Sequence, residues 1–132
     1  MHWFEIFPVF VVCHLAGDYL IQTDWQAVHK QHGLGSDPVA RRALGAHAAT
    51  YTLAYTPALI WLAPRLGAAT IVIVALLVLP HLIQDDGRLV ERYMRTVKHH
   101  MTRPDDPLGA MVDQSFHVLA LFGLALLGSA LS

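Results

Sequence analysis

Histidine and aspartate recur at helical spacing inside otherwise apolar stretches of this chain. Three pairs are separated by four residues: His14 with Asp18, His81 with Asp85, and Asp113 with His117. Four residues are about one helical turn, so both members of a pair project from the same face of a helix. A fourth apolar stretch contributes His47, with Tyr51 one turn further on. Ionisable groups inside apolar segments are costly and usually functional, which points to a shared centre that neutralises them.

These side chains together form a donor set suited to divalent metal ions. The predicted ligands are His14, Asp18, His47, His81, Asp85, Asp113 and His117. Imidazole and carboxylate favour Zn²⁺, with Mn²⁺ or Fe as alternatives, and seven donors suit two ions better than one, although a single ion stays open. Asp113 and Asp18 are also the candidate catalytic carboxylates, because an aspartate beside a metal can act as a general base. Asp86 directly follows Asp85, and helical spacing from His81 favours Asp85 as the ligand.

Four apolar segments position these residues, each near the roughly 20 residues that a helix needs to cross a bilayer core. They run from Trp3 to Ile21, Leu44 to Leu62, Leu66 to Ile83, and Leu108 to Leu131. Pro57 is expected to kink the second segment. We therefore predict an all-α fold, a four-transmembrane-helix bundle in which residues 1–132 form one membrane-embedded domain. Hydrophobic residues make up 55% of the chain and charged residues 14%, which agrees with this prediction.

The basic residues are distributed unevenly between the two ends of the predicted bundle. Every lysine and arginine except Arg65 lies between the first and second segments or between the third and fourth. Positive charge marks the cytoplasmic side, so both termini are predicted to lie outside. The longer connection has Leu89, Val90, Tyr93, Met94, Val97 and Met101 on one side, and Arg88, Arg92, Arg95 and Lys98 on the other. It predicts a cytoplasmic-side amphipathic helix in the headgroup plane, with a solvated loop helix as the alternative.

The predicted function is that of a membrane-embedded metal-dependent hydrolase with its centre near the cytoplasmic leaflet. A metal-activated water would attack a phosphoester or an acyl group. The basic segment from Arg88 to Arg103 could attract an anionic lipid headgroup, which makes a lipid a candidate substrate. The expected partners are the lipid bilayer and, through glycine-rich helix faces, a second copy of the chain as a homodimer. No nucleic-acid partner is expected.

A non-enzymatic role stays open, in which the metal site holds the helices together or passes an ion. Haem is disfavoured because it requires facing imidazoles without carboxylates, and His-x-x-His-His clusters typical of di-iron lipid oxidases do not occur in the sequence. The single cysteine, Cys13, excludes an internal disulfide. Glu5 near the start, with no lysine or arginine before it, predicts that the first apolar segment is retained and is not a signal peptide.

Neighbouring residues are expected to support the ligands. Gln22 continues the face of His14 and Asp18, and Gln114 is next to Asp113. Tyr51 could hydrogen-bond a ligand or a substrate, since it lies one turn from His47. Gly17 would let a neighbouring helix come close.

Several motifs resemble those of a known family. Residues 14–25 read HLAGDYLIQTDW, residues 81–85 read HLIQD and residues 113–117 read DQSFH. Together with His47, these H-L-x-G-D and D-Q-x-x-H stretches are similar to a group of small bacterial inner-membrane proteins catalogued as a domain of unknown function. The pattern is also similar, more distantly, to membrane-bound metal-dependent hydrolases in which histidine and aspartate on helices are taken as metal ligands. The resemblance covers nearly the whole chain and implies a bacterial inner-membrane location, a helical fold and a metal site.

Overall fold

The computed structural model describes residues 1–101 and 106–132 and places eight helices in them. In chain order these are α1 (Trp3–Leu15), the π-helix η1 (Ala16–Ile21), α2 (Asp24–His29), α3 (Pro38–Ala54), α4 (Thr56–Leu66), α5 (Ala69–Asp85), α6 (Arg88–Thr96) and α7 (Pro107–Leu131). The described residues contain no strand, so the prediction of an all-α fold is confirmed. Arg103, which belongs to the basic segment predicted above, lies outside the described residues.

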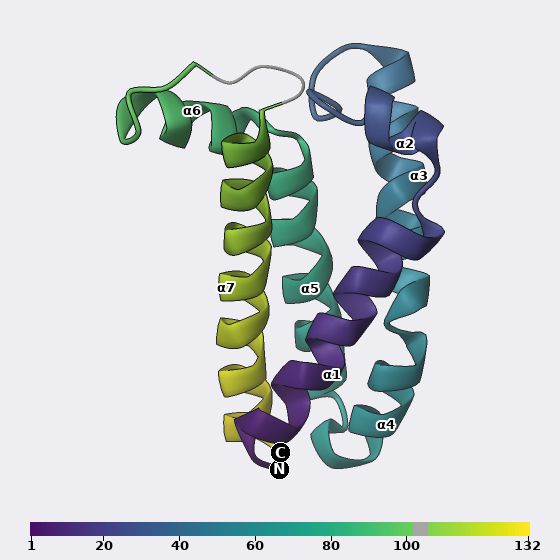
Figure 1. Cartoon of the computed structure of the whole chain (residues 1–132). Helices are drawn as coiled ribbons and strands as arrows, with labels where there is room; N and C mark the ends of the chain where they lie inside the picture. The colour runs from purple at the N-terminus through teal and green to yellow at the C-terminus, as the bar shows by residue number, and fades with distance from the viewer. Residues whose placement is uncertain (102–105) are drawn as a thin grey trace.

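The long helices run up and down a bundle whose two ends differ (Figure 1). α1 rises, α3 and α4 descend, α5 rises again, and α7 descends, while α2 and α6 lie at the end far from the termini. The two termini meet, because the Met1 ammonium donates to Ser132 Oγ at 2.8 Å and Ser129 Oγ donates to the Met1 carbonyl at 2.8 Å. We call the two ends of the bundle the terminal end and the α2–α6 end.

Two helices are long and apolar enough to cross a membrane. One is the 19-residue stretch Trp3–Ile21, which has the bounds predicted for the first span, and the other is the 25-residue α7. α5 and α6 qualify as a third only if they form one span bent by 60°. By length and composition the described helices therefore supply two or three spans and do not clearly supply the four that we predicted.

The second predicted span is divided into α3 and α4 at Tyr55. Pro57 has no backbone N–H and its ring blocks the carbonyl four residues earlier, so the α3 helix cannot continue through it. The Tyr55 amide bonds back to the Thr52 carbonyl at 3.1 Å, which closes α3 with a tight turn. The predicted kink at Pro57 is thus a complete helix break, and α3 begins at Pro38, six residues before the predicted start at Leu44.

Local sequence signals explain where the helices begin and turn. Asp37 caps α3 by accepting from the Val39 amide at 3.0 Å, and Asp106 caps α7 by accepting from the Leu108 amide at 3.1 Å. Each cap is followed by a proline at the first helical position, where its missing N–H costs nothing. Gly87 has a φ of 82° and makes the sharp turn between α5 and α6, a conformation that favours glycine.

The apolar core occupies the half of the bundle near the termini. It is built mainly from Ile6, Phe10, Tyr51, Tyr55, Leu62, Ile73, Leu77, Leu121, Leu124 and Ala125. The outer surface is also apolar: the exposed side chains include Leu20 (84%), Leu53 (69%), Ile60 (68%) and Ile71 (76%). A helical protein that exposes apolar residues on every long segment is suited to a lipid environment.

The predicted amphipathic helix corresponds to α6, which leaves α5 at an angle of 60°. Val90 and Met94 are buried against the bundle, whereas Leu89, Val97 and Met101 are exposed. Only part of the predicted apolar side therefore packs on the protein, and the rest remains available to lipid.

Gly17 is the glycine whose replacement tests this packing most directly. A Cβ at position 17 would lie 2.7 Å from the Tyr51 ring, whereas a Cβ at Gly45 would meet nothing within 4 Å. We predict that Gly17→Ala lowers the free energy of unfolding by about 1–3 kcal/mol because the ring must move. The matched control Gly45→Ala should be neutral or stabilising by about 0.5–1 kcal/mol. Thermal unfolding in detergent measures both, and equal effects at the two positions would contradict the observed helix contact.

Candidate metal centre

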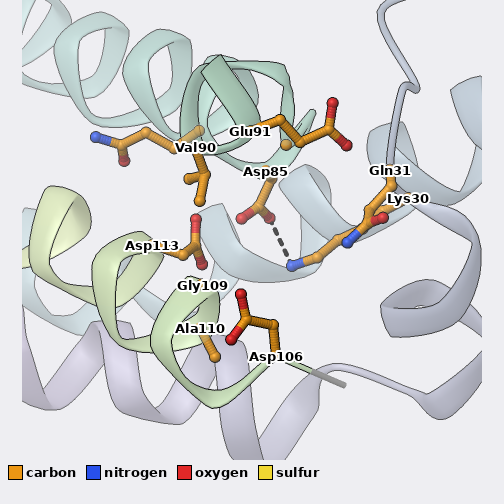
Figure 2. Close-up of a pocket in the computed structure, with 11 residues that line it drawn as sticks. Lys30, Gln31, Asp85, Val90, Glu91, Asp106, Gly109, Ala110 and Asp113 are labelled. Carbon is orange, nitrogen blue, oxygen red and sulfur yellow. Dashed lines mark hydrogen bonds and ion pairs between the residues drawn. The ribbon is translucent and has the colours of Figure 1, made fainter. Parts of the chain in front are cut away.

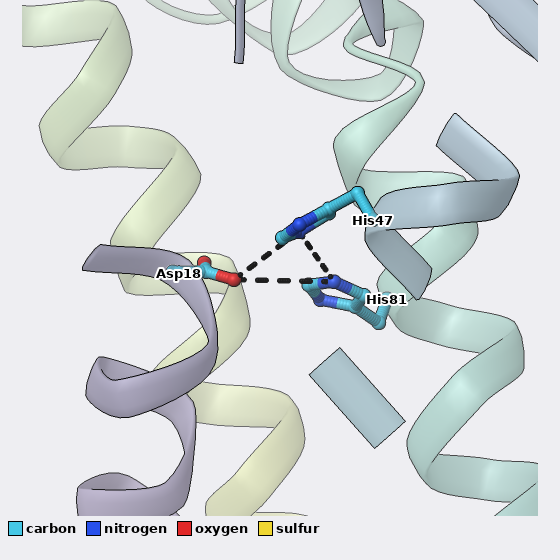
Figure 3. A group of neighbouring side chains, drawn as sticks. All are labelled: Asp18, His47 and His81. Atoms are coloured by element: carbon cyan, nitrogen blue, oxygen red, sulfur yellow. Dashed lines mark hydrogen bonds and ion pairs between the residues drawn. The ribbon is translucent and has the colours of Figure 1, made fainter. Parts of the chain in front are cut away.

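Side chains from all the long segments meet in one polar layer between the apolar core and the α2–α6 end. Five predicted ligands form two overlapping groups of possible metal donors, and both groups include His81. The first is Asp18, His47 and His81, and the second is His81, Asp85 and His117. All five side chains are buried. Figure 3 shows the first group, in which η1, α3 and α5 each supply one residue.

Four donor atoms in this layer lie close together around His47 and His81. His47 Nε2 lies 2.8 Å from Asp85 Oδ2, 3.1 Å from His81 Nε2 and 3.3 Å from Asp18 Oδ1. His81 Nε2 lies 3.2 Å from Asp85 Oδ2 and 4.0 Å from Asp18 Oδ1. Four ligands bound tetrahedrally at about 2.0–2.1 Å from Zn²⁺ would lie about 3.3 Å apart. The spacings of the two imidazole nitrogens to each other and to Asp85 Oδ2, 2.8–3.2 Å, are close to this value, and Asp18 Oδ1 lies at 3.3 and 4.0 Å from the same nitrogens, so a single small cation between the imidazoles could be reached by both carboxylates.

Asp18 Oδ1 supports this fit because it is a buried polar atom without a hydrogen bond in the described residues. Its distance of 3.3 Å from His47 Nε2 is short, but the angles are unsuited to a hydrogen bond. A buried carboxylate oxygen without a partner costs free energy. A cation bound among the four donors would remove that cost.

A chain of hydrogen bonds orients His81 toward the donor set. The Asp113 carbonyl can only accept, so His117 Nδ1, 2.9 Å away, carries the hydrogen of that bond. In a neutral ring, His117 Nε2 then has a lone pair, and it accepts from His81 Nδ1 at 3.1 Å. His81 Nε2 is left with its own lone pair facing His47, Asp18 and Asp85. Such anchoring of the far ring nitrogen is typical of metal-binding histidines.

His14 is anchored in a different direction. The Tyr55 hydroxyl donates to the Phe10 carbonyl at 2.9 Å, so it accepts from Tyr51 at 3.0 Å, and Tyr51 in turn accepts from His14 Nδ1 at 3.1 Å. His14 Nε2 lies 3.0 Å from Gln114 Oε1, which can only accept, so this contact and the bond from Nδ1 together require hydrogen on both ring nitrogens, that is, an imidazolium. Both ring nitrogens are therefore occupied outside the donor set, and His14 Nδ1 lies 3.6 Å from Asp18 Oδ2. The structure places His14 where it can position Asp18, while its predicted role as a ligand stays a prediction.

The expected supporting residues are present with some changes of partner. Tyr51 bonds to His14 and not to His47, and its ring stacks on that of His81 with centroids 3.5 Å apart and an angle of 9°. Gln114 bonds to His14, and Gly17 allows the close approach of Tyr51. These contacts orient the rings of His14 and His81, as expected of groups that surround a metal site, whereas His47 Nδ1 is buried without a hydrogen-bond partner among the described residues.

The π-helix at Ala16–Ile21 is the backbone feature that sets the position of Asp18. A π-helix has more residues per turn than an α-helix, so it rotates the side chains that follow His14 away from regular spacing. Asp18 consequently reaches toward His47 on α3 as well as toward His14. Isolated π-helical turns are frequent at functional sites.

The two neighbouring aspartates at the end of α5 have different environments. Asp85 Oδ2 belongs to the donor set and Asp85 Oδ1 lies 3.3 Å from His117 Nε2. Asp86 Oδ1, in contrast, accepts from the Leu34 amide at 2.8 Å, and Asp86 Oδ2 lies 3.2 Å from Arg88. The choice of Asp85 over Asp86 from helical spacing thus agrees with the geometry. Asp113 lies further out, with Oδ1 3.7 Å from His117 Nδ1, and it belongs to neither donor group.

A cavity of about 340 Å³ leads from the α2–α6 end to this layer. Asp85 and Asp113 line it, and so do Lys30, Glu91 and Asp106, which Figure 2 shows around the opening. Asp18, His47 and His81 do not line it. Of the four residues in the donor set, Asp85 alone therefore borders the cavity, while Asp18, His47 and His81 are enclosed by the helices.

Lys30 is the residue of the site that the sequence reasoning missed. Its ammonium donates to Asp85 Oδ2 at 2.8 Å and to Gln22 Oε1 at 2.8 Å. Lys30 is the residue after α2, outside the apolar segments, and so carries no helical spacing to the other site residues. In the sequence analysis, Lys30 counted only as one of the basic residues at the end predicted to be cytoplasmic.

The family described as "Protein of unknown function (DUF3307)" matches residues 6–130 of the chain. The chain belongs to this family. Membership in a family of unknown function, expected from the H-L-x-G-D and D-Q-x-x-H stretches, is therefore confirmed. No curated protein and no solved structure matches the chain.

Proposed function

We propose that this protein is a membrane-embedded, metal-dependent hydrolase whose centre holds one divalent cation, with Zn²⁺ as the first candidate. Asp18 Oδ1, His47 Nε2, His81 Nε2 and Asp85 Oδ2 are the proposed ligands. The observation that carries the proposal is the short spacing of His47 Nε2 and His81 Nε2 to each other and to the two carboxylates, in a buried layer that a cavity reaches through Asp85. His117 orients His81 in this proposal, since a neutral imidazole offers only one lone pair and His81 cannot serve two ions.

The cavity favours a catalytic centre over a purely structural one. Four protein ligands alone are typical of a structural zinc site, whereas a catalytic site also needs a position for water, sometimes by expanding to five ligands. The proposed centre therefore needs a water as a further ligand, on the side of Asp85 that borders the cavity. A volume of about 340 Å³ beside Asp85 is within the range of small-molecule sites. A bound divalent cation supplies Lewis acidity and makes a water molecule acidic enough to act as a nucleophile at neutral pH.

Asp113 is the proposed general base. Its carboxylate lines the cavity and is 28% exposed, so it can take a proton from a water there. The oxygen of that water adds to the phosphorus or acyl carbon of an ester, the ester bond breaks, and the alcohol leaves with a proton. Asp18 was predicted as an alternative catalytic carboxylate, but it does not line the cavity and its position suits a ligand better.

Transport of the ion is the second candidate, since the carboxylates at the cavity mouth would attract cations. The path beyond the centre argues against it. Between the polar layer and the terminal end lies the core around Phe10, Leu77 and Leu121, where the hydroxyls of Tyr51 and Tyr55 are already engaged in hydrogen bonds. An ion would therefore reach the centre and return by the same route.

We also propose that four segments cross the bacterial inner membrane, with α3 and α4 together forming the second crossing. Exposed apolar side chains on α3, α4 and α5, such as Leu53, Ile60 and Ile71, support a lipid environment for these segments as well. Basic residues at the α2–α6 end favour the cytoplasmic side for that end, so both termini lie outside. A lipid ester at the cytoplasmic leaflet could then enter the cavity from the side of α6.

The neighbouring residues Asp85 and Asp86 offer a matched test of the centre, because both are buried and only Asp85 faces the donor set. We predict that purified wild-type protein contains one equivalent of metal and hydrolyses p-nitrophenyl phosphate, p-nitrophenyl butyrate or phospholipid in mixed micelles. Chelation should abolish turnover and added metal should restore it. Asp85→Asn should weaken metal binding at least about 100-fold and remove turnover, whereas Asp86→Asn should keep both.

Metal content is measured by mass spectrometry and binding by titration of the chelator-treated protein. Wild-type protein with no stoichiometric metal would refute the centre. Metal binding without turnover on any ester class, in contrast, would leave the centre intact and favour the non-enzymatic alternative.

The proposed topology predicts which residues are reached from each side. In a Cys13→Ala background, Arg65→Cys and Ser132→Cys should react with a membrane-impermeant maleimide in intact spheroplasts. Lys98→Cys should react only after permeabilisation, because it closely follows α6, which lies at the opposite end. Leu79→Cys, on the lipid-facing surface, serves as an unreactive control. Labelling of Arg65→Cys and Lys98→Cys from the same side would exclude the proposed crossings.

A further inference from the structure

Lys30 supplies the positive charge closest to the proposed centre. Its ammonium lies 2.8 Å from Asp85 Oδ2, and its side chain is only 16% exposed. The same carboxylate oxygen lies 2.8 Å from His47 Nε2 and 3.2 Å from His81 Nε2. The ammonium and a cation bound by the donor set would therefore share one oxygen atom, and their charges would repel at short range.

The walls of the cavity make this ammonium unusual. Among the described residues that line it, Asp85, Glu91, Asp106 and Asp113 carry carboxylates, and Lys30 supplies the sole cation. Figure 2 shows the Lys30 side chain reaching across the opening to Asp85. An anionic group that entered the cavity would find one favourable partner in its wall, the Lys30 ammonium.

We propose that Lys30 is the anion-binding residue of this cavity and the counterion of the centre. It neutralises Asp85 when no cation is bound. When a cation takes over Asp85 Oδ2, the ammonium is free to pair with an anionic group of the substrate. This inference rests on the proposed function, and it assigns the substrate to esters with a negative charge near the scissile bond, such as phosphate esters.

Two consequences follow for Lys30→Met. Without the ammonium, the metal-free protein keeps a buried carboxylate with less compensation, and a bound cation no longer meets a nearby positive charge. Both effects increase the gain in stability on metal binding. At the same time, the metal-loaded protein loses its partner for an anion.

The first measurement is the rise in melting temperature when Zn²⁺ is added to chelator-treated protein in detergent. We expect Lys30→Met to bind metal about tenfold more tightly than wild type and to show a rise larger by about 3–6 °C. Lys30→Arg, which keeps the charge, should resemble wild type. Lys98→Met is the matched control, because it removes the chain's other lysine, which is exposed and does not line the cavity.

The second measurement adds an anion to the metal-loaded protein. Inorganic phosphate, and separately micelles containing phosphatidic acid, should raise the melting temperature of wild type, Lys30→Arg and Lys98→Met, and this rise should be lost in Lys30→Met. A response to phosphate identifies a free anion as sufficient, and a response to phosphatidic acid alone identifies a lipid headgroup. If neither raises the melting temperature of wild type, the assignment of an anionic substrate is overturned.

The outcomes separate this inference from the proposed function. Absence of metal binding in wild type refutes the centre itself. Metal binding in wild type with an unchanged metal-induced rise in Lys30→Met overturns the role of Lys30 and leaves the centre standing. If Lys30→Met can be purified only with metal present, the counterion role is supported. If it cannot be purified at all, Lys30→Gln replaces it, and wild-type behaviour of that variant overturns the inference.

Discussion

Compensation of buried charge is the constraint on which the rest of this structure depends. Carboxylates and imidazoles from different helices are enclosed at one level of a bundle whose outer surface is apolar. In such surroundings an unpaired ionised group is expensive, and only partners within a few ångströms can offset it. The short contacts of Asp85 with Lys30, His47 and His81 meet this requirement in part. Asp18 Oδ1 remains without a hydrogen bond among the described residues, and a cation would complete the compensation.

The bundle is organised in three levels around this requirement. The apolar core closes the terminal end, the polar layer occupies the middle, and the cavity opens from the α2–α6 end. Two backbone carbonyls next to the polar layer, those of Phe10 and Asp113, can only accept hydrogen bonds. They therefore determine which atoms of Tyr55 and His117 carry the hydrogen. Backbone carbonyls are fixed by their helices, so the imidazoles that depend on them are fixed as well. Under the proposed function, this preorganisation holds the ligand side chains in place before a cation or a substrate arrives.

Several of these features could be predicted from the sequence because they depend on local spacing. The four-residue interval placed both members of each His and Asp pair on one helix face, and the apolar pattern located the first span and, within one residue, the last. Pro57 was correctly identified as a point of distortion. Spacing also favoured Asp85 over Asp86 as the side chain on the face of His81, and Asp85 lies 3.2 Å from His81 Nε2.

Features that depend on tertiary contacts could not be predicted in this way. The π-helix at Ala16–Ile21 changes the direction of the Asp18 side chain, and no proline in that segment indicates a departure from α-helical geometry. Lys30 reaches Asp85 from a loop, across 55 residues of sequence, so no periodic pattern relates the two. The proposed separation of His47 and His81 as ligands from His14 and His117 as positioning residues depends on which ring nitrogen is already engaged. Spacing carries no information about that.

X-ray absorption spectroscopy of the Zn²⁺-loaded protein tests the central claim most directly, because it measures the ligands of the ion. Our account predicts a first shell of only nitrogen and oxygen at about 2.0–2.1 Å, with the outer scattering of two imidazoles. A shell that consists of water oxygens alone, or one with sulfur at about 2.3 Å, would contradict the account.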